Sequence, residues 1–161
     1  MGSASRRVAT FEARCHDCGV SFAVPLLSDM ESYGEYIVEG EAGTVFAYLC
    51  GLTEPAWDVV QGIHASLTRS RFSRLRGASS RGCLQWVIGR CLDPLDGQTL
   101  NVGKRFMCPL CHSDHIAFGD AVRVGFAELP VASSTRFLSL SPSERTSRVR
   151  QLCLAWLQGE R

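Results

Sequence analysis

Two short cysteine pairs constrain the fold of this chain more than any other feature of the sequence. Cys15 and Cys18 form one CxxC element, and Cys108 and Cys111 form the other. Both sulfurs of a CxxC turn can reach the same ion, so two such turns supply the four soft ligands that tetrahedral Zn²⁺ prefers. The sequence therefore predicts that the fold brings the two ends of an 89-residue segment together around one metal ion.

The neighbours of the cysteines fit a turn of this kind. The residue after the second cysteine of such a turn is often forced toward positive φ, which glycine accepts freely and histidine tolerates better than most residues. Gly19 suits that position well, and His112 suits it less well. We expect the histidines nearby, at positions 16, 112 and 115, to face solvent rather than replace a cysteine ligand.

Each cysteine pair follows a strand-like segment, Val8 to Ala13 for the first pair and Lys104 to Met107 for the second. Over about residues 8–24 and 104–118 the chain resembles the zinc ribbon and the related rubredoxin-type zinc knuckle. The resemblance implies one Zn²⁺ held by all four cysteines, and a closed shell of this kind is structural because it leaves no position for a reactive water. The long segment between the pairs departs from both families. Iron in a rubredoxin-like centre and unmetallated or redox-active thiols remain the alternatives.

Four further cysteines lie outside the pairs, at positions 50, 83, 91 and 153. They sit among apolar residues, so we expect them to be buried as small hydrophobic side chains. No two of them have the spacing of metal ligands, which argues against a second metal site built from these residues.

The pattern of apolar residues predicts an α+β fold with a small antiparallel sheet, a split zinc-ribbon element and two or three packed helices. The expected strands cover residues 8–13, 20–24, 35–39, 44–50, 104–107 and 122–126. One helix is expected after Thr53, as N-cap ahead of Pro55, with an outer face rich in arginine. Residues 84–91 have the spacing of a second helix, although Gly89 and the β-branched residues fit a strand nearly as well. The capping box from Ser141 to Glu144, with proline at the first helical position, predicts a C-terminal helix over about 142–157.

The length of 161 residues suits a single domain, in which residues 77–82 are the best linker candidate because they are small and polar. The apolar runs are far shorter than the roughly 20 residues of a membrane-spanning helix. The first residues lack the apolar core of a secretory signal. We therefore expect a soluble cytoplasmic protein.

Two enzyme patterns come close to this sequence without matching it. Zinc deaminases pair a Pro-Cys-x-x-Cys element with His-x-Glu, whereas here Met107 precedes the second pair and Ser66 follows His64 by two residues. Asp114 and His115 resemble the opening of an HNH-type nuclease motif, but no asparagine or histidine follows them. A zinc-containing nuclease-like or redox enzyme is therefore the weakest of three functional hypotheses.

The favoured hypothesis is a non-catalytic protein-interaction module, such as an adaptor, an inhibitor or an immunity-type protein, with another protein as its partner. Residues 1–58 hold three basic and nine acidic residues, a net charge of −6, while residues 59–105 hold eight basic and two acidic residues, a net charge of +6. Such asymmetry is typical of a binding protein. Tyr33 and Tyr36 are the candidate contact residues.

The alternative hypothesis is nucleic-acid binding, because zinc ribbons commonly serve that role. A basic tract between the two halves of the chain would neutralise phosphates and make binding sensitive to salt. The tract consists of Arg69, Arg71, Arg74, Arg76 and Arg81. An open tract would favour this hypothesis, and burial of the arginines against Glu31 to Glu41 would count against it.

Overall fold

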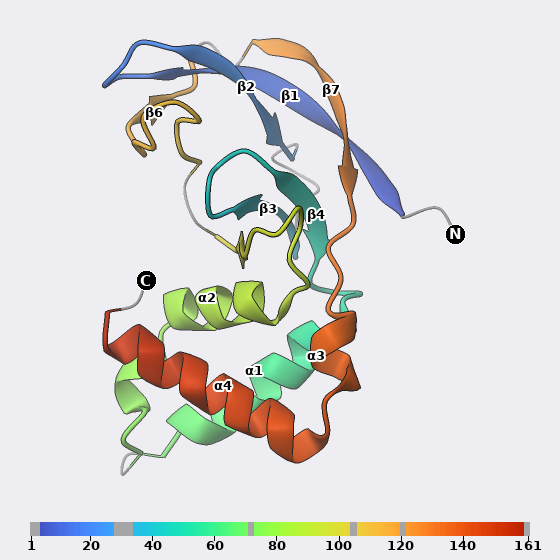
Figure 1. The fold of residues 1–161 in the computed structure, drawn as a ribbon, viewed down its shortest axis with the longest axis vertical. Coiled ribbons are helices and arrows are strands. Elements are labelled where there is room, and N and C mark those ends of the chain that lie inside the picture. Colours follow the sequence, from blue (N-terminus) through green and yellow to red (C-terminus); the bar gives the residue numbers. More distant parts are fainter. Residues whose placement is uncertain (1–3, 28–33, 71–72, 104–105, 120–121, 160–161) are drawn as a thin grey trace.

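The computed structural model describes residues 4–27, 34–70, 73–103, 106–119 and 122–159. Within these ranges the chain forms two small antiparallel sheets and four α-helices, one of them C-terminal, which confirms the α+β class. The first sheet lies at one end of the molecule, the helices lie at the other end, and the second sheet lies between them (Figure 1).

The first sheet is built around its longest strand, β1 (Ser5–Cys15). Strand β2 (Ser21–Leu26) pairs with one side of β1, from Ala9 opposite Leu26 to Arg14 opposite Ser21. Two strands from the second half of the chain, β6 (Ile116–Ala117) and β7 (Arg123–Pro130), also pair with β1 in antiparallel fashion. The sheet therefore joins segments that lie about a hundred residues apart in the sequence.

The second sheet consists of β3 (Glu35–Gly40), β4 (Phe46–Cys50) and β5 (Leu100–Asn101), with β3 in the middle. The chain turns between β3 and β4, where the N–H of Gly43 donates to the carbonyl of Gly40 at 2.9 Å. Gly43 has a φ of 70°, a conformation that a side chain would oppose.

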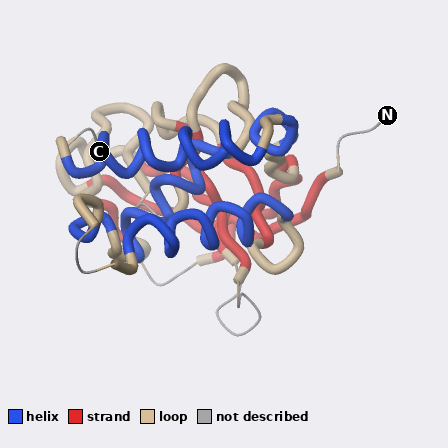
Figure 2. Tube along the Cα trace, turned by 90° about the horizontal axis from the view of Figure 1, so that it is seen from below, coloured by secondary structure: helices blue, strands red, loops and turns tan. Residues whose placement is uncertain are grey.

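The helical elements are α1 (Pro55–Thr68), the short 3₁₀ helix η1 (Arg76–Ala78), α2 (Arg81–Cys91), α3 (Thr135–Ser139) and α4 (Pro142–Leu157). Figure 2 shows these helices in front of the strands, so they cover one side of the second sheet. The predicted capping box is confirmed, with the Ser141 hydroxyl accepting from the N–H of Glu144 and the Glu144 carboxylate accepting from the N–H of Ser141. No helix in the described part of the chain is long and apolar enough to cross a membrane.

Three local predictions are wrong. Glu54, not Thr53, caps α1, because its carboxylate accepts from the N–H of Ala56. The expected linker is ordered backbone instead, since η1 occupies part of it and Ser80 caps α2 through the N–H of Cys83. Phe106 and Met107 do not belong to a strand, and residues 104–105 lie outside the described residues.

The buried residues divide unequally between two parts of the molecule. We call residues 4–26 and 106–130 the cysteine lobe, and residues 34–103 and 131–159 the helical lobe. Nineteen buried residues form one cluster in the helical lobe, among them Leu49, Val60, Ile88 and Val149. The second cluster has three buried members, Val8, Tyr48 and Leu129, and it lies where the lobes meet.

Tyr48 of β4 belongs to the helical lobe and lies in the small cluster where the lobes meet. Its backbone forms an isolated parallel bridge with Val131, and its carbonyl accepts from the N–H of Ala132 at 2.7 Å. Its hydroxyl donates to the Glu35 carboxylate, and the guanidinium of Arg6 lies 5.5 Å from the centre of its ring. Burial, followed by the Glu35 carboxylate, raises the pKa of Tyr48, so this phenol stays neutral and acts as a hydrogen-bond donor.

Candidate metal centre

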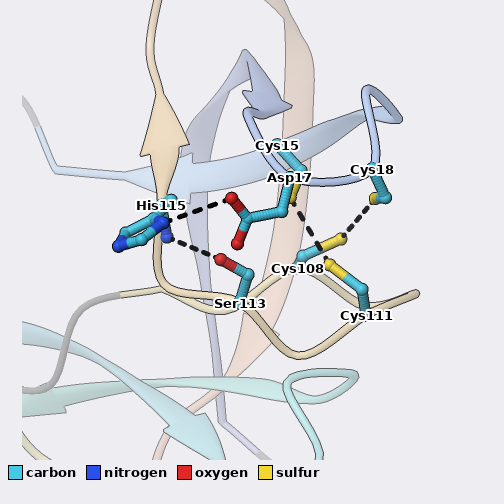
Figure 3. Close-up of polar contacts among 7 residues, drawn as sticks. All are labelled: Cys15, Asp17, Cys18, Cys108, Cys111, Ser113 and His115. Carbon is cyan, nitrogen blue, oxygen red and sulfur yellow. Dashed lines mark hydrogen bonds and ion pairs between the residues drawn. The ribbon is translucent and has the colours of Figure 1, made fainter.

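The fold brings the four paired cysteines together at one end of the first sheet (Figure 3). The sulfur atoms all lie within 4.8 Å of one another. The closest approaches are both between the pairs, at 3.5 Å from Cys15 Sγ to Cys111 Sγ and 3.5 Å from Cys18 Sγ to Cys108 Sγ. Cys15 and Cys108 are buried, whereas Cys18 and Cys111 lie at the surface. These four residues could hold one metal ion.

The two CxxC turns have the same backbone geometry. The N–H of Gly19 donates to the carbonyl of Cys15 at 2.9 Å, and the N–H of His112 donates to the carbonyl of Cys108 at 2.9 Å. Both donor residues have positive φ, 76° for Gly19 and 59° for His112, as the sequence predicts. The repeated geometry is consistent with a pair of zinc-knuckle turns, in which the histidine carries the conformational strain that glycine avoids.

Strand β6 determines how the two turns meet. Ile116 pairs with Cys15 at the end of β1, and the N–H of His16 donates to the carbonyl of His115 at 2.9 Å. Short as it is, β6 therefore fixes the second turn beside the first. The long intervening segment does not forbid this arrangement, because the entropy of closing a loop grows slowly with its length.

The thiols interact strongly with one another and with the backbone. Burial on its own raises the pKa of Cys108, but the N–H groups of Cys111 and Leu110 outweigh it and lower this pKa to about 7. The N–H of Ser113 lowers the pKa of Cys111, yet burial and the three neighbouring sulfurs together raise it to about 12. Four thiolates cannot share this site unless a cation offsets their repulsion, as a bound metal ion would.

A contact between Asp17 and His115 beside the sulfurs joins the two turns (Figure 3). His115 Nδ1 lies 3.2 Å from the Asp17 carboxylate, and the backbone N–H of His115 donates to the Ser113 hydroxyl at 3.0 Å. Hydrogen bonding from Ser113, followed by that from His115, lowers the pKa of Asp17. His115 thus contacts a carboxylate rather than a sulfur, and the cluster of candidate ligands contains no histidine.

The predicted contact tyrosines are not an exposed pair. The ring of Tyr36 stacks on Trp57, with centroids 5.0 Å apart, and packs against the main core. Tyr33 lies outside the described residues. Large apolar side chains are instead exposed on the cysteine lobe. The sequence pattern did not single them out, because apolar and polar residues alternate along a strand in the same way whether its apolar face is buried or exposed.

The predicted arginine tract is not a helix face, because α1 ends at Thr68. Arg69, Arg74, Arg76 and Arg81 are all exposed, and Arg71 lies outside the described residues. Glu35 and Glu41 contact other arginines, Arg6 and Arg90, at 3.9 Å and 3.5 Å. Glu35 and Glu41 therefore pair with arginines outside the tract, and the four described arginines of the tract stay exposed.

The structure also reveals groups that sequence reasoning missed. Arg90, Arg136 and Arg148 line a groove of about 620 Å³ beside Trp86. His64, Cys83 and Cys153 are all buried and offer three ligand atoms within 4.8 Å of one another, a grouping that the spacing of the unpaired cysteines did not indicate. Cys91 is buried as predicted, while Cys50 is only partly buried. No spacing rule detects the three-residue group, because its members come from three different helices.

The chain matches no protein-family model, and no curated protein or solved structure matches it. Its function must therefore be inferred from its own residues.

Proposed function

We propose that the four paired cysteines bind one structural zinc ion and that the lobe they hold together is a protein-binding module. The sulfur geometry supports zinc. With Zn–S bonds of about 2.3 Å, a regular tetrahedron has sulfur–sulfur edges of about 3.8 Å. The two short contacts of 3.5 Å lie near that value, and the remaining separations stay below 4.8 Å. A closed shell of four thiolates gives the ion no position for substrate or water.

The exposed apolar side chains of the cysteine lobe carry the proposal of a protein partner. A concentration of large exposed apolar side chains in one part of a chain is typical of interaction sites in soluble proteins. Six of the nine large apolar residues exposed on the described chain belong to this lobe or follow it directly: Leu110, Phe118, Val122, Val124, Phe126 and Val131. Three of them, Val122, Val124 and Phe126, lie along and just before β7, where the pairing of β7 with β1 is irregular between Arg123 and Gly125.

The charges around Phe126 indicate the chemistry of the partner. The guanidinium of Arg7 lies 4.3 Å from the centre of the Phe126 ring, and that of Arg123 lies 5.1 Å from it. Phe126 is 52% exposed, so a ring flanked by two cations is presented to solvent. A protein segment with an apolar side chain between acidic residues complements this surface in both shape and charge.

The metal site and this surface are mechanically connected. Both β6 and β7 pair with β1, and Cys15 is the last residue of β1. Loss of the metal would release the β6 end of the sheet and the segment that leads into β7. Zinc therefore acts at a distance from the partner, by holding the strands that present the surface.

Elemental analysis of protein purified without added metal tests the zinc site. We expect zinc at the cysteine pairs, with loss of that zinc in Cys15→Ser and Cys108→Ser. Iron in the same site would replace zinc with a coloured iron–thiolate centre. A folded, metal-free wild type would contradict the proposal and direct attention to thiol chemistry at the CxxC pairs.

A photo-crosslinking amino acid placed at position 124 tests the protein-binding surface in the cells that express this chain. We expect a crosslink to a defined protein, weakened by the double substitution Arg7→Ala and Arg123→Ala. The same crosslinker at position 52 is the control, because Leu52 is 66% exposed but lies on the helical lobe. Equal products from both positions, or none from position 124, would contradict the assignment of this surface.

The open arginine tract supports a second candidate function, nucleic-acid binding. None of Arg69, Arg74, Arg76 and Arg81 forms an ion pair with another described residue, so their charges are available to phosphates. Fluorescence anisotropy with single-stranded DNA and RNA of mixed sequence tests this function across a range of salt concentrations. Each arginine that binds a phosphate should, when replaced by alanine, lower the salt dependence, log K against log salt, by about 0.7. Arg150→Ala, an exposed position on α4, is the control.

A further inference from the structure

Three potential metal ligands meet inside the helical lobe, away from the CxxC pairs. His64 belongs to α1, Cys83 to the first turn of α2, and Cys153 to α4. Their exposed fractions are 5%, 0% and 0%, and the three candidate ligand atoms lie within 4.8 Å of one another. Soft sulfur and imidazole nitrogen together form the ligand set that zinc commonly accepts.

The hydrogen bond of His64 prepares its ring to act as a ligand. His64 Nε2 lies 2.8 Å from the carbonyl oxygen of Ala78. A carbonyl only accepts hydrogen bonds, so Nε2 carries the proton and the lone pair of the neutral ring is on Nδ1. Metal-bound histidines typically donate their second N–H to a backbone carbonyl or a carboxylate in this way, which fixes the tautomer and the orientation of the ring.

We propose that His64, Cys83 and Cys153 form a second zinc site, with three protein ligands instead of four. Two thiolates and a neutral imidazole around Zn²⁺ carry no net charge, so the complex can be buried without the large cost of an unpaired ion. In a tetrahedral site the ligand atoms lie about 3.5–3.8 Å apart, so binding draws the three atoms together by at most about 1.3 Å from the present limit of 4.8 Å.

His64 lines a surface groove together with Gln61, Thr68, Ser79 and Ser80, whereas Cys83 and Cys153 are fully buried. The second site therefore differs from the four-cysteine site in its number of protein ligands and in the complete burial of its two thiols.

Zinc at this site would link α1, α2 and α4, the three longest helices of the helical lobe. None of its three ligands belongs to the CxxC pairs or to the proposed protein-binding surface.

Zinc stoichiometry of the full-length wild type provides the first test. The reduced protein is stripped with a chelator in the absence of oxygen, loaded with excess zinc and freed of unbound metal by gel filtration. We expect about two zinc ions per chain, one at each site. A value of about one, in protein whose CxxC pairs bind metal, would overturn the second site and leave the first intact.

Matched cysteine substitutions assign the second ion. We expect Cys83→Ser and Cys153→Ser to retain about one zinc, while Cys91→Ser retains two because Cys91 is a buried residue of α2 outside the cluster. Cys15→Ser, which disrupts the first site, should still bind about one. Two zinc ions in folded Cys83→Ser or Cys153→Ser would overturn the ligand assignment.

Cobalt titration of the wild type avoids any dependence on how the variants fold. Co²⁺ bound by four thiolates has a different absorption spectrum from Co²⁺ bound by two thiolates and one imidazole. We expect two spectrally distinct binding steps. A single step with the four-thiolate spectrum would overturn the proposal.

Discussion

The two lobes of this protein differ in the number of apolar residues that they bury. The helical lobe buries nineteen residues in one continuous cluster, and its helices cover a three-stranded sheet. The cysteine lobe contributes only two buried residues, Val8 and Leu129, to the small cluster at the boundary between the lobes. The cysteine lobe also buries Ala13, Val24, Cys15 and Cys108, but far fewer apolar residues than the helical lobe, and the proposed metal ion would provide a further source of stability.

The two lobes also differ in the apolar residues that they expose. The helical lobe hides its apolar residues, whereas most of the large apolar side chains exposed on the described chain belong to the cysteine lobe. A metal cross-link lets a small sheet present such residues, because the sheet does not need to bury them in order to fold. A lobe that is stabilised by an apolar core must bury such residues and cannot present them to a partner.

Metal removal should separate the lobes most clearly. Structural zinc contributes about 10 kcal/mol or more of apparent binding free energy in small zinc domains, more than a cluster of this size can replace. With a chelator present, we expect backbone amides of β1 and β7 to lose protection from hydrogen exchange. The amides of α1, α2 and α4 should keep most of theirs, because the main core remains when the second zinc site is empty. Equal loss of protection in both lobes would contradict a stabilising role of the metal that is confined to the cysteine lobe.

A core substitution should have the complementary effect. Leu49 is fully buried in the main cluster, so Leu49→Ala should lower the free energy of unfolding of the helical lobe by about 2–5 kcal/mol. Denaturant titration monitored through the helical circular dichroism signal measures this loss. Leu52→Ala, at an exposed position, should change stability by about 0.5 kcal/mol or less. Zinc retention by Leu49→Ala at the CxxC pairs would show that the lobes fail separately.

Two glycines test how closely the helical lobe is packed. A Cβ atom at Gly89 would lie 2.3 Å from the backbone oxygen of Leu100, so Gly89→Ala must push α2 away from β5. We expect a loss of about 2 kcal/mol in thermal or denaturant unfolding. Gly62→Ala in α1 meets nothing within 4 Å and should stabilise the protein by up to about 1 kcal/mol. Equal effects at the two positions would contradict close packing of α2.

The smallest expected effect concerns the start of α4. Ser141→Ala removes the side chain that accepts from the N–H of Glu144 and should cost about 1 kcal/mol. Ser147→Ala, at an exposed position within the same helix, is the matched control. Denaturant midpoints of the two variants provide the measurement. A loss in the control as large as that in Ser141→Ala would point to α4 as a whole rather than to its cap.

Features that depend on neighbouring residues could be predicted from the sequence alone. The capping box at Ser141 and the positive φ at Gly19 and His112 follow from local backbone chemistry, and all are found in the structure. The meeting of the two cysteine pairs was also predictable, although they are distant in sequence, because the ligand number of a tetrahedral ion requires a second pair.

The remaining features depend on how the elements pack in three dimensions. Glu54 rather than Thr53 caps α1, Tyr36 turns inward onto Trp57, and the arginine tract lies beyond the end of the helix. His64, Cys83 and Cys153 come together because three helices pack at particular rotations about their axes. Spacing along the chain predicts contacts within one turn or one helix, but the rotation of a helix against its neighbours depends on the packing of the whole core.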